Sequence, residues 1–226
     1  MSHHVDKINV KKSVRSKDRL LRPWTSRYPE YYYEDLRRFQ PRHYYEQPVM
    51  PYTHRDRRHR HRHHGSDQSM RSTVTKEMLE LHNRHRARHC ARPLTISQRL
   101  NRIAQDYAEH LAATSKFEHS GTKFEGQHMG ENLYMNWISD GHVTVSTKAA
   151  VKFWYDEIAL HDFDRPIFSK ETGHFTQMVW KDSRKMGVGV ALSPDKREVY
   201  FVTTYFPGGN IIGPGTFEKN VLPPNC

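Results

Sequence analysis

Two apolar segments near the C-terminal end, separated by one short turn, constrain the fold most. Residues 185–192 (Lys-Met-Gly-Val-Gly-Val-Ala-Leu) and 198–206 (Glu-Val-Tyr-Phe-Val-Thr-Thr-Tyr-Phe) are rich in β-branched and aromatic side chains. Ser193–Lys196, which lies between them, has the composition of a turn. The pattern predicts two antiparallel strands.

Helical patterns come before these strands. In one segment, apolar residues recur at alternating steps of three and one, which places them on one face of a helix that Ser97 can cap. They are Leu100, Ile103, Ala104, Tyr107, Ala108 and Leu111. Two further helices are expected, from about Lys76 to His89 after caps at Ser72, Thr73 or Thr75, and from Lys148 to about Leu160 after Ser146 or Thr147. Early helices followed by late strands predict an α+β sandwich.

Basic charge is concentrated in the first third of the chain. Residues 1–72 contain 17 Lys and Arg against 8 Asp and Glu, whereas residues 73–226 contain 19 against 17. Residues 1–72 include few aliphatic residues, and their apolar residues do not recur with the period of a strand or a helix. This segment therefore cannot bury enough apolar surface to offset chain entropy. We therefore expect a disordered basic tail over residues 1–72 and a folded domain over residues 73–226.

The tail ends in a run of arginine and histidine from His54 to His64, which contains Arg55, Arg57, Arg58, Arg60 and Arg62. These arginines are the predicted contact to an anionic membrane, which would strengthen at low pH as the imidazoles become charged. Histidine-rich runs also capture transition metals loosely. Arginines with interleaved tyrosines can bind nucleic acid, but no nucleic-acid fold motif accompanies them, so we expect that partner least. A solvated tail with no specific partner is the alternative.

The two cysteines and the N-terminal residues bear on location. Cys90 and Cys226 are too few for a disulfide scaffold, and we expect two reduced thiols in a protein that faces the cytosol, with a bridge between them as the alternative. Residues 1–7 lack the apolar segment of a signal peptide, no apolar run is long enough to span a membrane, and Ser2 offers no acceptor for N-myristoylation.

Four polar residues on separated segments are candidate site residues. His119 lies in a polar connection, Glu131 follows a glycine, and His174 precedes an apolar run. Glu157 falls near the apolar face of its expected helix, where an unpaired carboxylate is costly, so it needs a partner. Any one histidine is more often a surface or hydrogen-bonded residue than a metal ligand.

Several motifs together resemble the CAP superfamily (SCP domain), which contains cysteine-rich secretory proteins, wasp-venom antigens and plant pathogenesis-related proteins. They are residues 130–132 (Gly-Glu-Asn), 173–180 (Gly-His-Phe-Thr-Gln-Met-Val-Trp) and 205–210 (Tyr-Phe-Pro-Gly-Gly-Asn). Residues 180–189 and 218–224 specifically resemble the Golgi-associated plant pathogenesis-related subgroup. The likeness covers about residues 74–226 and implies a three-layer α-β-α sandwich with a shallow cleft.

The resemblance implies that His119, Glu131, Glu157 and His174 form the cleft tetrad. Two imidazoles can bind Zn²⁺ or another divalent metal, with the glutamates as ligands or as orienting groups; a hydrogen-bonded network that holds the helices is equally expected. The leading hypothesis is a non-enzymatic binding protein for lipid or sterol, membrane surfaces or protein partners, with homodimers as in the family. A metal-dependent hydrolase using the tetrad is one alternative, and nucleic-acid binding through the tail is another. The expected location is the cytoplasmic face of the Golgi membrane, with an extracellular location, as in most of the family, as the alternative.

Overall fold

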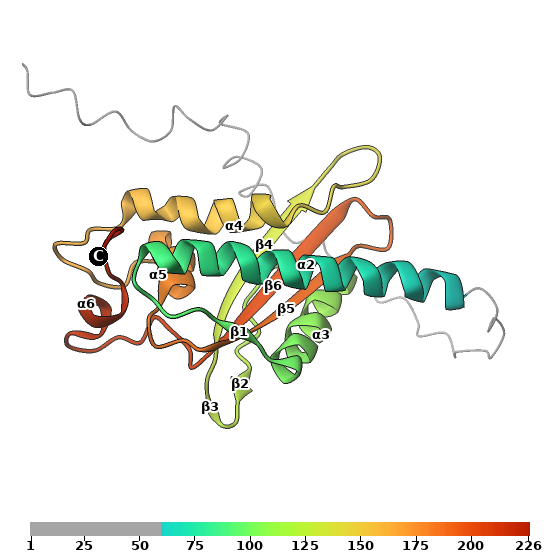
Figure 1. The fold of residues 1–226 in the computed structure, drawn as a ribbon. Coiled ribbons are helices and arrows are strands. Elements are labelled where there is room, and N and C mark those ends of the chain that lie inside the picture. The colour runs from blue at the N-terminus through green and yellow to red at the C-terminus, as the bar shows by residue number, and fades with distance from the viewer. Residues whose placement is uncertain (1–59) are drawn as a thin grey trace, which may run out of the picture. The chain divides into compact units, whose positions relative to one another are not determined.

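The computed structural model describes residues 60–226, with side chains from residue 67 onward. A four-stranded mixed sheet in the order β1-β5-β6-β4 forms the middle layer (Figure 1). Its strands are β1 (Thr95–Ile96), β4 (Gly130–Trp137), β5 (Lys185–Leu192) and β6 (Glu198–Phe206). A small separate hairpin consists of β2 (Lys123–Phe124) and β3 (Gln127–His128).

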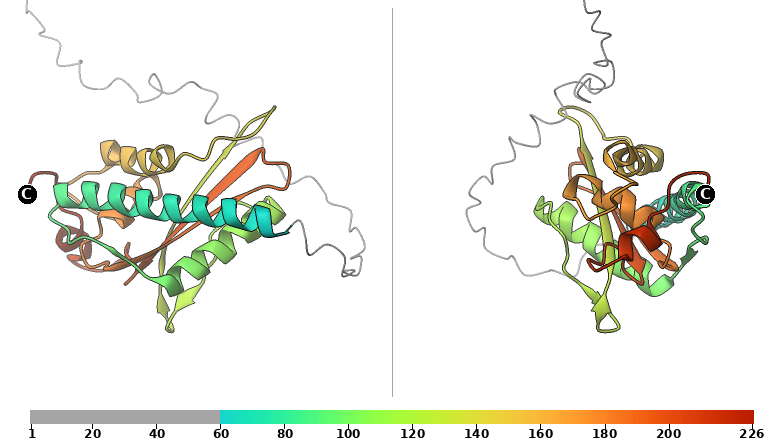
Figure 2. Two further views of the ribbon diagram at one scale, coloured as in Figure 1. Left: turned by 45° about the vertical axis from the view of Figure 1, so that its right-hand side comes forward. Right: turned by 90° about the vertical axis from the view of Figure 1, so that its left-hand side faces the viewer.

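Helices cover both faces of the sheet. They are α2 (Arg60–Arg88), α3 (Gln98–Thr114), α4 (Thr147–Asp156), α5 (Gly173–Val179) and α6 (Thr216–Asn220), with short 3₁₀ turns η2 (Glu157–Leu160) and η3 (Lys170–Thr172). The end-on view of Figure 2 places α3 on one side of the sheet and α2 and α4 on the other. The predicted α-β-α sandwich is therefore confirmed.

The face with α2, α4 and α5 holds the larger core. Met78, Trp154, Phe175 and Phe201 belong to one continuous cluster there and are fully buried. The cluster packs the three helices together, so residues of α4 and α5 that lie far apart in the sequence come side by side.

The face with α3 has a closer helix–sheet contact. A Cβ built at Gly187 would lie 2.2 Å from the backbone carbonyl carbon of Leu100, so glycine is what lets α3 approach β5 this closely. Two side chains of α3 also satisfy the edge of β5, because Asn101 Oδ1 and Gln105 Oε1 accept hydrogen bonds from the N–H groups of Val188 and Val190. This edge of the sheet is thereby blocked against further strand pairing.

Four elements agree with the sequence expectations at one boundary or both. The strands β5 and β6 begin and end where predicted and pair antiparallel. Ser97 caps α3 and Ser146 caps α4, each through its side-chain oxygen.

The first domain helix is longer than predicted. α2 begins at Arg60 rather than near Lys76, so residues 60–72, predicted as part of the disordered tail, are helical. The hydroxyls of Thr73 and Thr75 donate to the carbonyls of Ser69 and Arg71, four residues earlier, and do not act as caps. Arg60 and Arg62 lie in the first turns of α2, where side chains are not described, and Arg55, Arg57 and Arg58 lie outside the described residues.

The expectation of two reduced thiols is wrong. Cys90, just after α2, and Cys226, the last residue, form a disulfide with their Cα atoms 6.0 Å apart. The expectation was based on the compartment, whereas the bridge results from the position of the C-terminal segment against the end of α2, where Asn225 N–H donates to Arg88 O at 2.8 Å.

Candidate functional site

The expected cleft tetrad consists of two histidine–glutamate pairs, and its first half lies between α5 and the end of α4. His174 Nδ1 lies 2.6 Å from Glu157 Oε1. The other carboxylate oxygen, Oε2, accepts the backbone N–H groups of His174 and Phe175 at 2.9 and 3.0 Å. His174 is thus the partner that Glu157 was expected to need near an apolar helix face. Glu157 also accepts the backbone N–H groups at the start of α5, which have no partner within the helix.

The second half joins β4 to the loop after α3. His119 Nδ1 lies 2.8 Å from Glu131 Oε1, and the same oxygen accepts the backbone N–H of Ser120 at 2.9 Å. The side chain of His119 is 61% exposed, whereas that of Glu131 is 7% exposed. The hydrogen bond to Glu131 raises the pKa of His119 above its ordinary value; burial opposes this effect and the charge of Glu131 adds to it.

Both pairs fix the histidine tautomer in the same way. A carboxylate only accepts hydrogen bonds, so Nδ1 of each imidazole carries the hydrogen. Nε2 of the neutral ring then keeps a free lone pair, which is the arrangement of a metal-binding histidine oriented by a carboxylate.

Buried polar side chains of the three motifs hold the two halves together. Gln177 Oε1 accepts the N–H of Gly209 at 2.8 Å, and a Cβ at Gly130 would lie 1.9 Å from the same oxygen. Asn132 Nδ2 donates to the carbonyl of His174 at 3.1 Å. Since Asn132 follows Glu131 on β4, this bond brings the strand that carries one pair into contact with the helix that carries the other.

Asn210 has a similar role on the far side of α5. Its Oδ1 accepts from Thr176 Oγ1 at 2.6 Å, and its Nδ2 donates to the carbonyl of Gly173 at 2.9 Å. No role of Asn132, Gln177 or Asn210 was predicted from the sequence. The signal that could have found them is an amide side chain within a motif beside buried apolar residues, where it must be hydrogen-bonded.

The hydroxyl groups nearest the histidines in sequence bond elsewhere. Ser120 Oγ accepts the N–H of Thr122 at 3.1 Å, and Thr176 Oγ1 bonds to the carbonyls of Thr172 and Gly173 as well as to Asn210. Neither hydroxyl is hydrogen-bonded to an imidazole, so the geometry differs from that of a serine hydrolase, in which the base accepts the proton of the nucleophile.

The two histidines and the two glutamates are arranged as two pairs. Among the side chains described, residues 67–226, no group of three or more His, Cys, Asp and Glu residues is arranged to hold a metal ion. One further donor atom is present, because Glu131 Oε2 is buried and has no hydrogen-bond partner among the described residues. The described side chains therefore form no closed four-ligand structural metal site.

The fold and the cleft together define a class of protein: an α-β-α sandwich in which two histidine–glutamate pairs meet at β4 and α5. The family model of the cysteine-rich secretory protein (CAP) family matches residues 79–206. The chain belongs to the CAP family.

Individual relatives agree with this assignment. The chain is 45% identical to the human Golgi-associated plant pathogenesis-related protein 1 over 148 residues, which are 66% of this chain and 92% of the relative. It is 35% identical to the Protein PRY2 of Saccharomyces cerevisiae over 147 residues, 65% of this chain and 40% of that protein. Among solved structures, BmVAL-1 matches with a TM-score of 0.52 at 23% identity, covering 68% of this chain and 84% of that one, which shows the shared fold alone.

Proposed function

We propose that this protein is a non-enzymatic CAP-domain binding protein. The observation that carries the proposal is the use of both cleft glutamates: each orients an imidazole and at the same time accepts backbone N–H groups. Groups fixed in this way keep both rings in one orientation and leave their two Nε2 atoms to a ligand. They leave no hydroxyl nucleophile on either histidine, which favours binding over acyl transfer.

The cleft's proposed ligand is a divalent metal such as zinc, bound weakly by Nε2 of His119 and His174. Bound there, the metal would supply a positive charge in the cleft, and Glu131 and Glu157 would keep both rings in the binding tautomer. The unpartnered Oε2 of Glu131 also keeps the metal-dependent hydrolase as a second candidate, because a buried free carboxylate oxygen can accept a proton from a water molecule.

Zinc titration of the full chain tests this proposal. The run from His54 to His64 would itself take up zinc, so the measurements use a background in which its five histidines are replaced by Gln. His119→Ala and His174→Ala are each expected to abolish the zinc-dependent rise in melting temperature, and exposed His142→Ala serves as the matched control. A rise that survives in both cleft variants contradicts the proposal, and an ester or peptide hydrolysis rate lost in both would favour the hydrolase.

The second part of the proposal is peripheral attachment to anionic membranes, with the cytoplasmic face of the Golgi as the location. Three observations support it: the name of the human relative, the basic run and an exposed loop patch. None of the described helices has the length and apolarity to cross a bilayer. The loop patch comprises Ile167, Phe168, Ile211 and Ile212. The two loops meet at Gly173, where a built Cβ would lie 3.7 Å from the Phe168 ring and where the Asn210 amide is bound. Lipid or sterol, protein partners and homodimer formation stay predictions.

Vesicle sedimentation tests the membrane part. Replacing Arg55, Arg57, Arg58, Arg60 and Arg62 with Gln in the full chain should weaken binding to phosphatidylserine vesicles and flatten its salt dependence, since each well-placed basic residue contributes about 1 kcal/mol. The matched control replaces five exposed basic residues of the domain, namely Arg92, Arg102, Lys148, Lys185 and Lys196. Equal loss in both variants would contradict a specific role of the basic run, and binding to RNA in preference to vesicles would favour the nucleic-acid alternative.

A further inference from the structure

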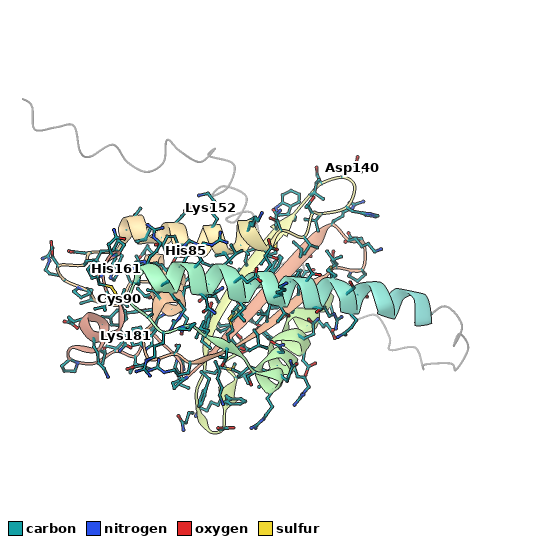
Figure 3. All side chains as sticks on the ribbon, viewed as in Figure 1. His85, Cys90, Asp140, Lys152, His161 and Lys181 are labelled. Carbon is teal, nitrogen blue, oxygen red and sulfur yellow. A yellow bond between two sulfur atoms is a disulfide. The ribbon has the colours of Figure 1, made fainter. Side chains whose placement is uncertain are left out.

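The last six residues form a strap across the end of α2. In this strap, residues 221–226, the carbonyl of Leu222 lies 2.6 Å from His89 Nδ1, and the N–H of Asn225 donates to the carbonyl of Arg88 at 2.8 Å. The Cys90–Cys226 disulfide fastens the end of the strap. Figure 3 labels Cys90 at this end of the domain. Val221, at the start of the strap, is buried. Without the bridge, the residues after Val221 would be held in place by those two hydrogen bonds.

The bridge is open to chemistry. Both Cys90 and Cys226 are exposed. A dithiol can attack either sulfur as its thiolate, which breaks the S–S bond and releases the other sulfur as a thiolate that takes up a proton. The second thiol of the reductant then displaces the remaining protein sulfur, leaving two protein thiols and an oxidised reductant. Exposed disulfides are the kind that serve as labile, regulatory bonds.

His89 connects the strap to the interior. A carbonyl only accepts hydrogen bonds, so Nδ1 of His89 donates to Leu222 and Nε2 accepts from the hydroxyl of Tyr155 at 2.9 Å. The His89 ring also meets the ring of Phe175 edge-on, with centroids 5.4 Å apart. His89 is 1% exposed, so the strap covers a residue that contacts both α4 and α5.

The contacts continue from these aromatic residues to one half of the cleft. Phe175 donates its N–H to Glu157 Oε2, the oxygen that also accepts from the His174 N–H. Tyr155 precedes Glu157 by two residues and packs on Phe175 with ring centroids 5.7 Å apart. The other half, His119 with Glu131, is attached to the loop after α3 and to β4. Its link to α5 is the bond from Asn132 to the backbone carbonyl of His174, which involves neither His119 nor Glu131.

We propose that the Cys90–Cys226 bridge is a thiol–disulfide switch that acts on one half of the cleft. When oxidised, it holds the strap on His89 and keeps the Glu157–His174 pair rigid. When reduced, it releases the strap and loosens that pair, while the His119–Glu131 pair is unchanged. The switch does not depend on a bound metal.

Hydrogen exchange of the full chain, oxidised and after treatment with a dithiol, tests the switch. Reduction should accelerate amide exchange about tenfold in residues 221–226, and several-fold in residues 155–163 and 173–179, with rates in residues 98–114 and 119–132 unchanged. Cys226→Ser should reproduce the reduced pattern and show no further response to the dithiol, which separates the bridge from other effects of the reductant. Equal acceleration in all these segments, or none, would overturn the proposal.

Two variants test the route through His89. His89→Leu removes both hydrogen bonds, so the oxidised and reduced chains should exchange alike over residues 155–179. The milder Tyr155→Phe should reduce the acceleration of exchange over residues 155–179 to roughly half of its wild-type value. The acceleration in residues 221–226 should stay the same. If reduction still accelerates exchange over residues 155–179 to the wild-type extent in both variants, the route through His89 is excluded. Acid-quenched thiol alkylation in cells completes the test, because a bridge that stays wholly oxidised or wholly reduced through a peroxide or dithiol challenge is not a switch.

Discussion

The carboxylate of Glu157 binds His174 twice, once through the imidazole Nδ1 at 2.6 Å and once through the backbone N–H at 2.9 Å. One side chain therefore fixes both the position of the helix start and the orientation of the ring. Stability and the orientation of the His174 ring depend on the same group.

Replacing Glu157 should consequently affect both properties. Glu157→Ala leaves the N–H groups of His174 and Phe175 without their acceptor, and we expect a loss of about 2 kcal/mol in the free energy of unfolding, measured by urea denaturation. Nitrogen NMR of the His174 ring should then show mixed tautomers. Exposed Glu118→Ala is the control and should change stability by less than about 0.5 kcal/mol. A Glu157→Ala protein as stable as that control would contradict the assigned role.

His119 should titrate above the ordinary histidine pKa because of Glu131. The hydrogen bond to the carboxylate raises its pKa in the folded state, so the stabilisation is fully present below the unfolded value of about 6.5 and is lost as pH rises through the folded value. Proton NMR titration should show the pKa of His119 falling toward the ordinary value in Glu131→Gln. His161, whose pKa burial lowers, is the internal control and should titrate identically in both proteins. An unchanged His119 titration would show that the pair does not form in solution.

Arg86 is a buried cation bound by carbonyl groups. Its guanidinium donates to the backbone carbonyls of Arg92, Met178, Trp180 and Ser183, and the side chain is fully buried. Burial lowers the pKa of Arg86 to about 10, so the group stays charged at neutral pH.

Arg86→Lys should be strongly destabilising although the charge is kept. A lysine has three donors and no planar fork, so it leaves buried carbonyls unsatisfied, and we expect a loss of about 3 kcal/mol or more. Urea denaturation checks this, with exposed Arg84→Lys as the matched control. A loss below about 1 kcal/mol would mean that water replaces the missing donors.

Local sequence patterns predicted the elements whose signals are local. The strands β5 and β6 follow from their β-branched and aromatic runs, and α3 from its apolar stripe after Ser97. The need of Glu157 for a partner also followed from its position in the helix. In each case the information lies within about one turn or one strand of the residue concerned.

Features that depend on distant residues were missed. β4 carries the polar residues Glu131, Asn132 and Asn136, so its sequence lacks the apolar pattern that predicts a strand. Its pairing partner β6 comes about 70 residues later in the chain. The bridge joins cysteines that are 136 residues apart, and no local pattern reports that their Cα atoms approach to 6.0 Å. The start of α2 was misplaced because three possible capping residues instead lie inside a continuing helix.

Acid should destabilise the fold through the buried His82. Its Nδ1 bonds to the carbonyl of Met78 and its Nε2 to the hydroxyl of Tyr205, both in the core. Burial lowers the pKa of His82 to about 3, with smaller contributions in the same direction from Arg86 and His85 and an opposing one from the Met78 bond. The unfolded chain takes up a proton below pH of about 6.5, whereas the folded chain does not.

Stability contributed by the neutral His82 is therefore complete above pH of about 6.5 and falls as pH decreases toward 3, by about 1.4 kcal/mol per pH unit. In urea denaturation between pH 7.5 and 4.5, His82→Gln should show a shallower pH dependence, because Gln offers a donor and an acceptor without titrating. Exposed His110→Gln should retain the wild-type slope. Equal slopes in the wild type and in His82→Gln would show that His82 becomes protonated within the folded core, and the acid sensitivity would then have to come from His85, whose pKa burial lowers to about 4.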